Sequence, residues 1–419
     1  MTVSLTKGDG STRNSPSTRG AKEKIVVLGT GYVGFPLAVL LARSGFKVVG
    51  VDIRTELVRA INEGTLPIRE REIEAIFKEA AVRDNLIASD VVTPGDVYVI
   101  SVPTPLEKRR KIADLSAVIA ATASILPHLR KGNVIILEST VPPLTCREVL
   151  TPLIESRTDL KANVDVGLVH CPERILPGNI FEEIVKNDRV IGSMSAEARE
   201  RAAAIYQSFV KGRIFLTDDV TAELVKIMEN TFRDVNIALA NEFAMVAETL
   251  GVNIKEAIEI ANAHPRVDIL RPGIGVGGHC IPIDPWFLTE VDPAHTNLIT
   301  VARRINDSIP GRVSAKLRLT VADVSEPRIV LIGMSYKPDT DDVRDSPALE
   351  ISETLRMDGY DVRHYDPLVE SKGYASLVEA AKGADLLAIL VPHTRVIQEY
   401  YSTELQVKAG MRRPRVLTF

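Results

Sequence analysis

A thiol within a glycine-rich segment is the strongest candidate for covalent chemistry in this sequence. Cys280 lies in GIGVGGHCIPIDPWF (residues 273–287), and Asp284 follows it four residues later. Glycines before a nucleophile let the backbone approach a substrate closely, and a carboxylate can act on water or on a nearby lysine. We therefore predict that Cys280 is a catalytic nucleophile and that Asp284 assists it.

The sequence context separates the three cysteines of the chain. A free cysteine most often behaves as a small apolar core residue, and this is our interpretation of Cys146 and Cys171. A reactive thiolate also needs a pKa below the usual value of about 8.5, which positive charge or a hydrogen bond provides. His279 and Lys226 are the candidates for lowering the pKa of Cys280.

Lys226 and Asn230 form a second candidate pair. They are four residues apart in a stretch with helical periodicity, so both side chains project from one face of the helix. The pair either converges on a reacting oxygen or belongs to a solvated helix face, and the spacing does not distinguish the two.

The motif GTGYVG places Gly29, Gly31 and Gly34 directly after an apolar strand and before a helix. Such glycines let the backbone turn tightly and approach a pyrophosphate, whose negative charge the helix N-terminus favours. Asp52 ends the next apolar run and can accept a hydrogen bond from a ribose 2′-hydroxyl while it repels a 2′-phosphate. The pattern predicts an NAD site rather than an NADP site or a merely tight turn, although Arg54 places a cation close to the acid.

A second strand, at residues 328–333, leads into GMSYKPDTDD, which lacks the second and third glycines of the first motif. This segment and its continuation add Lys337 and Arg344, and cations at strand ends suit a phosphate group. Ordinary solvated surface charge is the alternative explanation of these cations. The difference between the two motifs predicts one domain for NAD and another for a substrate that carries a nucleotide.

Continuous runs of Val, Ile and Leu indicate parallel strands that are buried on both faces. The runs lie at residues 25–29, 47–52, 96–103, 133–140, 164–173, 328–333, 361–366, 384–392 and 416–419. Because helical stretches separate most of them, we predict an α/β protein with two Rossmann-like, doubly wound domains. Residues 221–251 keep helical periodicity and belong to a helical central segment that joins the two domains.

These elements divide the chain into four parts. Residues 1–22 are rich in Ser, Thr and Gly without apolar periodicity, so we predict a disordered tail. Residues 23–216 are the expected NAD-binding domain, residues 217–325 the central helical domain, and residues 326–419 the C-terminal nucleotide-binding domain. A long helix needs a partner for its apolar faces, so we also expect the central domain to form a homodimer interface.

Composition limits the partners of the protein. The 419 residues carry a formal net charge of −4, and 25% of them are charged without a basic stripe of the kind that binds nucleic acid. No apolar span is long enough to cross a membrane. The three cysteines are too few and too irregularly spaced for a disulfide framework or a Cys-x-x-Cys metal site. We expect a cytoplasmic protein without a metal that binds neither nucleic acid nor membrane.

The motifs together resemble the nucleotide-sugar 6-dehydrogenases, the family of UDP-glucose and GDP-mannose dehydrogenases. The resemblance begins at about residue 23 and rests on GTGYVG, SVPTP (101–105), ESTVPP (138–143), CPERILPG (171–178), AELVKIMEN (222–230), HPRVDI (264–269), GVGGHCIPIDPWF (275–287) and SYKPDTDDVRDSP (335–347). Because so many motifs occur in the order of the family, the resemblance is highly specific. The resemblance implies NAD as cofactor, a UDP-sugar as substrate, and a homodimer.

The resemblance further implies that a primary alcohol is oxidised to a carboxylate in two steps that use two NAD. Lys226, or a water beside it, takes the hydroxyl proton in the first oxidation, and Cys280 then adds to the aldehyde. The thiohemiacetal is oxidised to a thioester, which is hydrolysed. Lys226 and Asn230 are expected to stabilise the oxyanions. The expected water and proton network comprises Thr140, Glu173 and Asp284.

Binding residues follow from the resemblance position by position. The residues expected to contact NAD, besides the three glycines, are Tyr32, Val33, Asp52, Thr104 and Thr140. Those expected to contact the substrate are Arg174, Ile175, Lys226, Asn230, Arg233, His264, Arg266 and Gly277, with Arg266 reaching across the dimer. The nucleotide end is expected to be held by Tyr336, Lys337 and Arg344.

Within the family, HPRVDI, GGHC before DPWF, and ARRIND (302–307) are most similar to enzymes that oxidise UDP-N-acetyl-D-mannosamine to its uronate. Val276, Ile283 and Pro177 depart from the pattern of the UDP-glucose enzymes. UDP-N-acetyl-D-glucosamine 6-dehydrogenases share GGHCIPIDP and are the alternative. Two rival classes also remain: a two-electron β-hydroxyacid dehydrogenase that uses no thiol, and a non-catalytic NAD-sensing protein.

Overall fold

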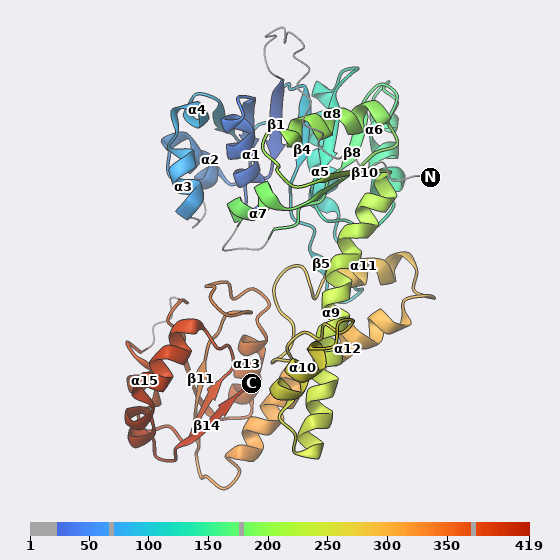
Figure 1. Cartoon of the computed structure of the whole chain (residues 1–419). Helices are drawn as coiled ribbons and strands as arrows, with labels where there is room; N and C mark the ends of the chain where they lie inside the picture. Colours follow the sequence, from blue (N-terminus) through green and yellow to red (C-terminus); the bar gives the residue numbers. More distant parts are fainter. Residues whose placement is uncertain (1–22, 67–70, 176–179, 370–373) are drawn as a thin grey trace. The chain divides into compact units, whose positions relative to one another are not determined.

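The computed structural model describes residues 23–66, 71–175, 180–369 and 374–419, which form two compact units (Figure 1). The first unit ends at Met228 and the second begins at Glu229, within helix α9 (Asp219–Leu250). The predicted tail at residues 1–22 and the last three residues of the CPERILPG motif, 176–178, lie outside the described residues. Among the helices that the structure describes, none is long and apolar enough to cross a membrane.

The first unit is built on an eight-stranded sheet. Its strands, in their order across the sheet, are β10 (Ile214–Thr217), β9 (Arg189–Gly192), β8 (Gly167–His170), β7 (Val134–Leu137), β4 (Val97–Ile100), β1 (Lys24–Leu28), β2 (Lys47–Val51) and β3 (Leu86–Ser89). The strand order reverses at β1, which has β2 on one side and β4 on the other; ligands of doubly wound sheets bind at this point. The predicted fold is confirmed, but β8 and β9 pair antiparallel, so the sheet is mixed.

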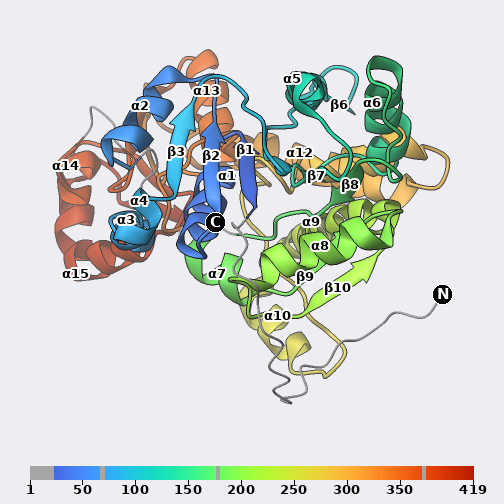
Figure 2. The same ribbon diagram turned by 90° about the horizontal axis from the view of Figure 1, so that it is seen from above.

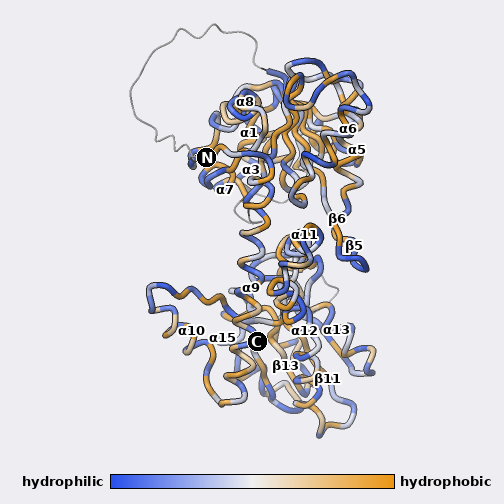
Figure 3. Tube along the Cα trace, turned by 90° about the vertical axis from the view of Figure 1, so that its right-hand side faces the viewer, coloured by the Kyte–Doolittle hydropathy of each residue, from blue (hydrophilic) through white to orange (hydrophobic). Residues whose placement is uncertain are grey.

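Helices cover both faces of this sheet, which explains its uninterrupted apolar strands (Figure 2). In β1, Ile25 and Val27 face the core that α1 (Gly34–Arg43), α7 (Ile180–Lys186) and α8 (Ala196–Gln207) share. Val26 and Leu28 face the opposite core, which α5 (Ser116–Ile125) and α6 (Thr151–Arg157) share. Because both faces are buried, successive residues of the strand must all be apolar. Figure 3 shows these hydrophobic segments inside the unit and hydrophilic segments on its outer loops.

Shorter elements complete the first unit. They are α2 (Thr55–Glu63), α3 (Arg71–Phe77), α4 (Ala80–Arg83), the hairpin of β5 (Leu106–Glu107) and β6 (Ile112–Ala113), the 3-10 helix η1 (Leu126–His128) and the π-helix η2 (Thr145–Leu150). The π-helix follows the ESTVPP segment and contains Cys146. π-Helices are rare, and single turns of this kind are often found at functional sites.

The second unit combines helices with a smaller, parallel sheet. The strands, in their order across the sheet, are β12 (Asp361–Tyr365), β11 (Arg328–Ile332), β13 (Leu386–Ile389) and β14 (Arg415–Thr418). The helices after α9 are α10 (Ile254–Asn262), α11 (Asp284–Val291), α12 (Asn297–Thr320), α13 (Pro347–Met357), α14 (Leu377–Ala381) and α15 (Thr394–Gly410). The predicted central segment, residues 217–325, begins on the last residue of β10, and the rest of it is described and contains helices and no strand. The second Rossmann-like sheet and its last strand are confirmed.

Candidate active site

The glycine-rich turn after β1 lies against the loop that follows β4. A Cβ atom on Gly29 would lie 2.5 Å from the carbonyl oxygen of Ser101, and one on Gly34 would lie 1.9 Å from that of Gly29, so packing requires glycine at both positions. A Cβ atom on Gly31 would meet only Arg54 Nη2, at an ordinary contact distance of 3.7 Å. The packing of the chain therefore leaves room at position 31, where a dinucleotide needs close approach to the backbone.

Asp52 lies directly after β2 and is buried. Its Oδ2 accepts from the Thr30 amide at 2.8 Å, and its Oδ1 accepts from the amide and Nε of Arg54 at 3.0 and 3.1 Å. Burial by itself raises the pKa of Asp52, but the hydrogen bonds from Arg54 and Thr30 outweigh it and lower the pKa below its ordinary value. The carboxylate is therefore ionised, and it suits the predicted role of acceptor for a ribose hydroxyl.

The other predicted cofactor residues lie in the turn and at neighbouring strand ends. Tyr32 and Val33 belong to the turn itself, and about half of the Tyr32 surface is exposed. Thr104 follows β4 and Thr140 follows β7, and the Thr104 hydroxyl donates to the Thr140 carbonyl oxygen at 2.6 Å. Because β4 and β7 are adjacent and parallel, their following loops meet, and the structure brings these two residues together.

Glu173, which follows β8, is held in a buried ionic network that the sequence pattern does not reveal. Arg189 Nη2 donates to Glu173 Oε2 at 2.5 Å, and Arg189 Nη1 lies 3.4 Å from Glu138 Oε1. The Tyr206 hydroxyl donates to Glu138 Oε1 at 2.9 Å, and its ring stacks on the guanidinium. Burial first, and then the charge of Glu173, raise the pKa of Glu138 to about 8. Glu138 thus keeps a proton at neutral pH.

The remaining predicted residues of the first unit have different surroundings. Arg174 is half-buried, and its Nη1 donates to the Asp188 carbonyl oxygen at 2.8 Å. Ile175 packs against the hydrophobic core of this unit. Lys226 is half-buried on α9.

In the second unit, the Cys280 turn is tied to α9 through Asp284. Cys280 is exposed, whereas the other two cysteines are fully buried, as predicted. The Asp284 amide donates to the Cys280 carbonyl oxygen at 2.8 Å, and α11 begins at Asp284. Asp284 Oδ2 accepts from Asn230 Nδ2 at 2.6 Å, and both side chains are buried. The structure therefore brings Asn230, Asp284 and the thiol-bearing turn together.

The glycines before Cys280 allow the turn to pack against the loop after β11. A Cβ atom on Gly277 would lie 2.5 Å from the Asp345 carbonyl oxygen, and one on Gly278 would lie 3.0 Å from the Tyr336 ring. Gly278 also has a φ of +85°, which side-chain-bearing residues rarely adopt. The sequence predicted that these glycines serve substrate approach; the structure adds a packing role within the second unit.

Predicted substrate residues gather around Tyr336. Burial, followed by the charges of Asp342 and Cys280, raises the pKa of Tyr336, while the cations Arg344 and Arg233 oppose the shift. Arg344 also pairs with Asp342, with Nη2 and Oδ2 2.6 Å apart. An aromatic ring with cations and a thiol near it suits a substrate with a planar base or sugar next to phosphates.

Three other predicted substrate residues lie near these elements. Lys337 Nζ is 5.8 Å from the centroid of the Tyr336 ring. His264 and Arg266 are exposed on the segment after α10, where the Arg266 amide donates to His264 Nδ1 at 3.4 Å. No described contact joins these two to the group around Tyr336.

A buried histidine, which sequence analysis missed, holds the loop after β11. His393 Nδ1 accepts from the Asp339 amide at 2.9 Å, and its Nε2 lies 3.1 Å from Asp366 Oδ2 and 3.3 Å from Ser335 Oγ. These partners come from segments up to 58 residues away in sequence. No local spacing could have identified them.

A second missed network holds the segment that leads to the Cys280 turn. Asn241 on α9 accepts from the Gly273 amide at 3.0 Å and donates to Asn306 Oδ1 at 3.0 Å. Asn306 in turn donates to Asp234 Oδ1 at 2.9 Å, and Arg303 pairs with the same carboxylate. Asn306 and Arg303 of the ARRIND motif therefore help to position the segment that leads to the Cys280 turn.

Comparisons with known proteins agree with this arrangement. Residues 23–210, 220–308 and 330–417 match, in turn, the NAD binding domain, the central domain and the UDP binding domain of the UDP-glucose/GDP-mannose dehydrogenase family. A UDP-N-acetyl-D-mannosamine dehydrogenase of Methanocaldococcus jannaschii is 44% identical over 379 residues, which cover 89% of this chain and 86% of that protein.

Two further relatives extend the comparison. An NDP-N-acetyl-D-galactosaminuronic acid dehydrogenase of Ralstonia nicotianae is 42% identical over 337 residues, which cover 79% of each protein. The solved structure of a UDP-D-ManNAc dehydrogenase from Pyrococcus horikoshii matches with a TM-score of 0.89 and 43% identity, over 94% of both chains. The chain is similar to these proteins over nearly its whole length.

Substitutions in the glycine turn should separate folding from cofactor binding. Gly31→Ala adds a methyl group where only Arg54 lies within 4 Å, so we expect the free energy of unfolding to change by less than about 1 kcal/mol. NAD affinity should fall at least tenfold because the methyl group occupies space that the pyrophosphate needs. Gly34→Ala is the matched control and should destabilise the fold by about 1–3 kcal/mol. Thermal unfolding and NAD titration check this, and unchanged affinity of Gly31→Ala would contradict it.

The raised pKa of Glu138 predicts a dependence of stability on pH. Between its ordinary pKa of 4.5 and about 8, the folded protein holds a proton that the unfolded chain has lost. The stabilisation is complete below pH 4.5 and is lost as the pH rises through about 8, with a slope of at most about 1.4 kcal/mol per pH unit. Glu138→Gln imitates the protonated acid and should remove this slope. The free energy of unfolding of both proteins, measured between pH 5 and 9, tests this. If the difference between the two proteins does not vary with pH, the raised pKa does not belong to Glu138.

Proposed function

The chain belongs to the UDP-glucose/GDP-mannose dehydrogenase family and is an NAD-dependent oxidoreductase, and on that premise we propose that it oxidises UDP-N-acetyl-D-mannosamine to UDP-N-acetyl-D-mannosaminuronate. The central observation is the exposed Cys280 in a turn that also carries the Asn230-bound Asp284. The names of the Methanocaldococcus and Pyrococcus relatives support this substrate. The predicted Tyr336 and Arg344 neighbourhood supports binding of its nucleotide end.

The proposed chemistry assigns each residue one role. NAD, when bound, accepts hydride in both oxidations. Lys226, or a water beside it, takes the proton of the sugar 6-hydroxyl. The Cys280 thiolate then adds to the aldehyde carbon and forms a C–S bond, and the carbonyl oxygen becomes an alkoxide. After the second oxidation, water attacks the thioester, the carboxylate is released, and the thiolate is restored.

Hydrogen-bond capacity supports the assignment of Asn230. An amide nitrogen carries two N–H groups, and Asn230 donates one to Asp284 at 2.6 Å. We assign the second N–H to the oxyanion that forms at the sugar carbon, because a donor fixed in advance stabilises developing charge. Asp284 and Glu173, with Thr140, are the proposed water and proton network. We also place the enzyme in the cytoplasm, because Cys280 must remain a reduced thiol to act.

An exposed apolar stripe on α9 supports the proposed homodimer. The residues of this stripe recur every three to seven positions on the helix and are each more than 40% exposed: Phe232, Leu239, Phe243, Val246 and Leu250. This spacing corresponds to one face of a helix, and a second copy of the chain would cover it symmetrically. The exposed Arg266 is proposed to contact the substrate of the partner subunit.

Product stoichiometry tests the covalent route. We expect the wild type to form two NADH for each molecule of UDP-N-acetyl-D-mannosamine, and Cys280→Ser to form no uronate and at most one NADH, because the serine hydroxyl is a far weaker nucleophile. NADH absorbance and chromatography of the nucleotide sugar measure both products. Retained NAD affinity in Cys280→Ser is the control for folding.

Two results would reject the proposal. One NADH per product in the wild type would indicate a two-electron β-hydroxyacid dehydrogenase, and NAD binding without turnover on any UDP-sugar would indicate a sensing protein. A panel with UDP-N-acetyl-D-glucosamine and UDP-glucose tests the substrate. Higher kcat/KM for UDP-N-acetyl-D-glucosamine would replace the proposed substrate with the alternative.

The apolar stripe predicts a variant that dissociates the dimer. Phe243→Asp places a charge where the partner would bury an aromatic ring, which costs at least about 2–3 kcal/mol of association free energy per side chain. Light scattering after gel filtration should show a monomer at concentrations where the wild type is a dimer. Glu242→Ala, at the adjacent exposed position, is the control and should remain dimeric. A dimeric Phe243→Asp protein would place the interface elsewhere.

A further inference from the structure

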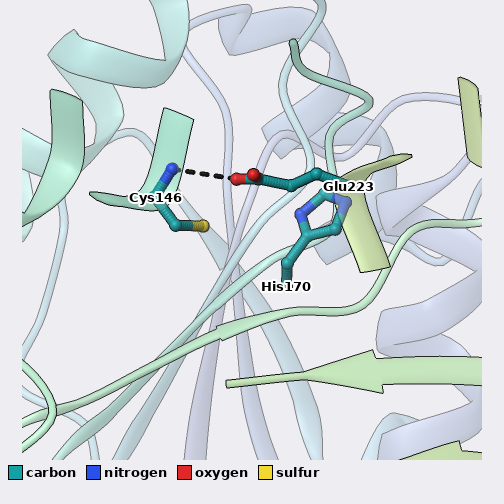
Figure 4. Close-up of side chains that lie close together, drawn as sticks. All are labelled: Cys146, His170 and Glu223. Atoms are coloured by element: carbon teal, nitrogen blue, oxygen red, sulfur yellow. Dashed lines mark hydrogen bonds between the residues drawn. The ribbon is translucent and has the colours of Figure 1, made fainter. Parts of the chain in front are cut away.

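Three side chains that the proposed mechanism does not use meet in the interior of the first unit. Cys146 comes from the π-helix η2, His170 ends β8, and Glu223 lies on the second turn of α9. The sulfur, a ring nitrogen and a carboxylate oxygen all lie within 4.8 Å of one another. Figure 4 shows the three side chains directed toward one another. All three side chains are fully buried.

His170 lacks the hydrogen bonds that a buried imidazole requires. Neither Nδ1 nor Nε2 meets the distance and angle of a hydrogen bond to a described residue, although none of the side chain is exposed. Leaving a buried polar atom unsatisfied costs about 1–3 kcal/mol, so each such atom in a native fold needs an explanation. A neutral imidazole has a lone pair on one ring nitrogen, which is the atom that binds a metal ion.

The other two groups can complete a set of metal ligands. Glu223 accepts from the amides of Leu144 and Cys146 at 2.7 and 2.9 Å, one on each oxygen. The carboxylate also accepts from the Cys146 thiol, and loss of the thiol proton would free that position for a metal ion. A thiolate, a carboxylate and a neutral imidazole together carry two negative charges, which a divalent cation neutralises. A neutral complex is the arrangement that a buried site tolerates.

We propose that the first unit binds a zinc-class divalent metal ion through Cys146 Sγ, one ring nitrogen of His170 and a carboxylate oxygen of Glu223. Sulfur, nitrogen and oxygen donors in one site suit Zn²⁺, which prefers four ligands, and water takes the fourth position. On binding, the Cys146 thiol releases its proton to solvent and the sulfur bonds to the metal, without any change of oxidation state. The spacing of the cysteines in the sequence gave no indication of this site, because its ligands are 24 and 53 residues apart in the chain.

The proposed ion has a structural role. It joins the segment after β7, the end of β8 and the start of α9, which are held at present by the amide hydrogen bonds to Glu223. Glu223 precedes Lys226 by one helical turn, so the ion fixes the part of α9 from which the catalytic lysine projects. The ion takes no part in the oxidation of the sugar.

Metal content and a cobalt spectrum test the proposal directly. The protein used in this test carries Cys280→Ser, so that an exposed thiol does not compete for the added metal ions. After growth with zinc and gel filtration, we expect one Zn²⁺ per chain by elemental analysis. Replacement by Co²⁺ should give a thiolate-to-cobalt charge-transfer band. Cys146→Ser and His170→Phe should each lose the bound metal and the band, whereas Cys171→Ser, which changes another buried thiol, should keep both.

The melting temperature with and without a zinc chelator tests for the bound metal even if a ligand variant folds poorly. A zinc chelator should lower the Tm of the full-length protein by several degrees and leave the Tm of His170→Phe unchanged, because that variant has no metal to lose. If neither ligand variant folds, the cobalt spectrum of the Cys280→Ser and Cys171→Ser double variant decides, since Cys146 is then the only thiol. Absence of stoichiometric metal, metal retained by both ligand variants, or no charge-transfer band would overturn the proposal.

Discussion

The hydrogen bond between the Asn230 amide and the Asp284 carboxylate is the interaction on which the proposed chemistry depends. Both groups are buried, so each would pay a large desolvation cost without the other. The Asp284 amide also donates to the Cys280 carbonyl oxygen, which closes the backbone turn between the two residues. Because Asn230 lies on α9, this contact fixes the cysteine relative to a long helix rather than to a loop alone.

Two further sets of contacts hold the Cys280 turn in place. Gly277 and Gly278 bring the turn against the loop after β11: a side chain at 277 would collide with that loop, and one at 278 would press on the Tyr336 ring at a strained φ. Asn241 holds the preceding segment at Gly273 and is itself fixed through Asn306. A reactive group that is held from several sides loses little freedom when substrate binds, which favours catalysis by positioning.

Sequence analysis predicted the elements that local patterns encode. The apolar runs located β1, β2, β4, β7, β8 and all the strands of the second sheet, and the spacing of Gly29, Gly31 and Gly34 with Asp52 located the turn after β1. It missed β3, β9, β10 and the β5–β6 hairpin, and it did not foresee the antiparallel pairing of β8 with β9. It could not find the contacts of Arg189 with Glu138 or of His393 with Asp366, because these join residues 51 and 27 positions apart. Long-range polar pairs leave no periodic signal in a sequence.

The most direct test of the central claim is to trap the acyl intermediate on Cys280. Asp284→Asn keeps a hydrogen-bonding group beside Asn230 but removes the carboxylate that we assign to thioester hydrolysis, so the intermediate should accumulate during turnover. The measurement is peptide mass spectrometry after an acid quench with substrate and NAD present. The account predicts the mass of the uronyl nucleotide on the peptide that contains Cys280, and its loss on treatment with hydroxylamine. Continued formation of uronate with no adduct on that peptide would contradict it.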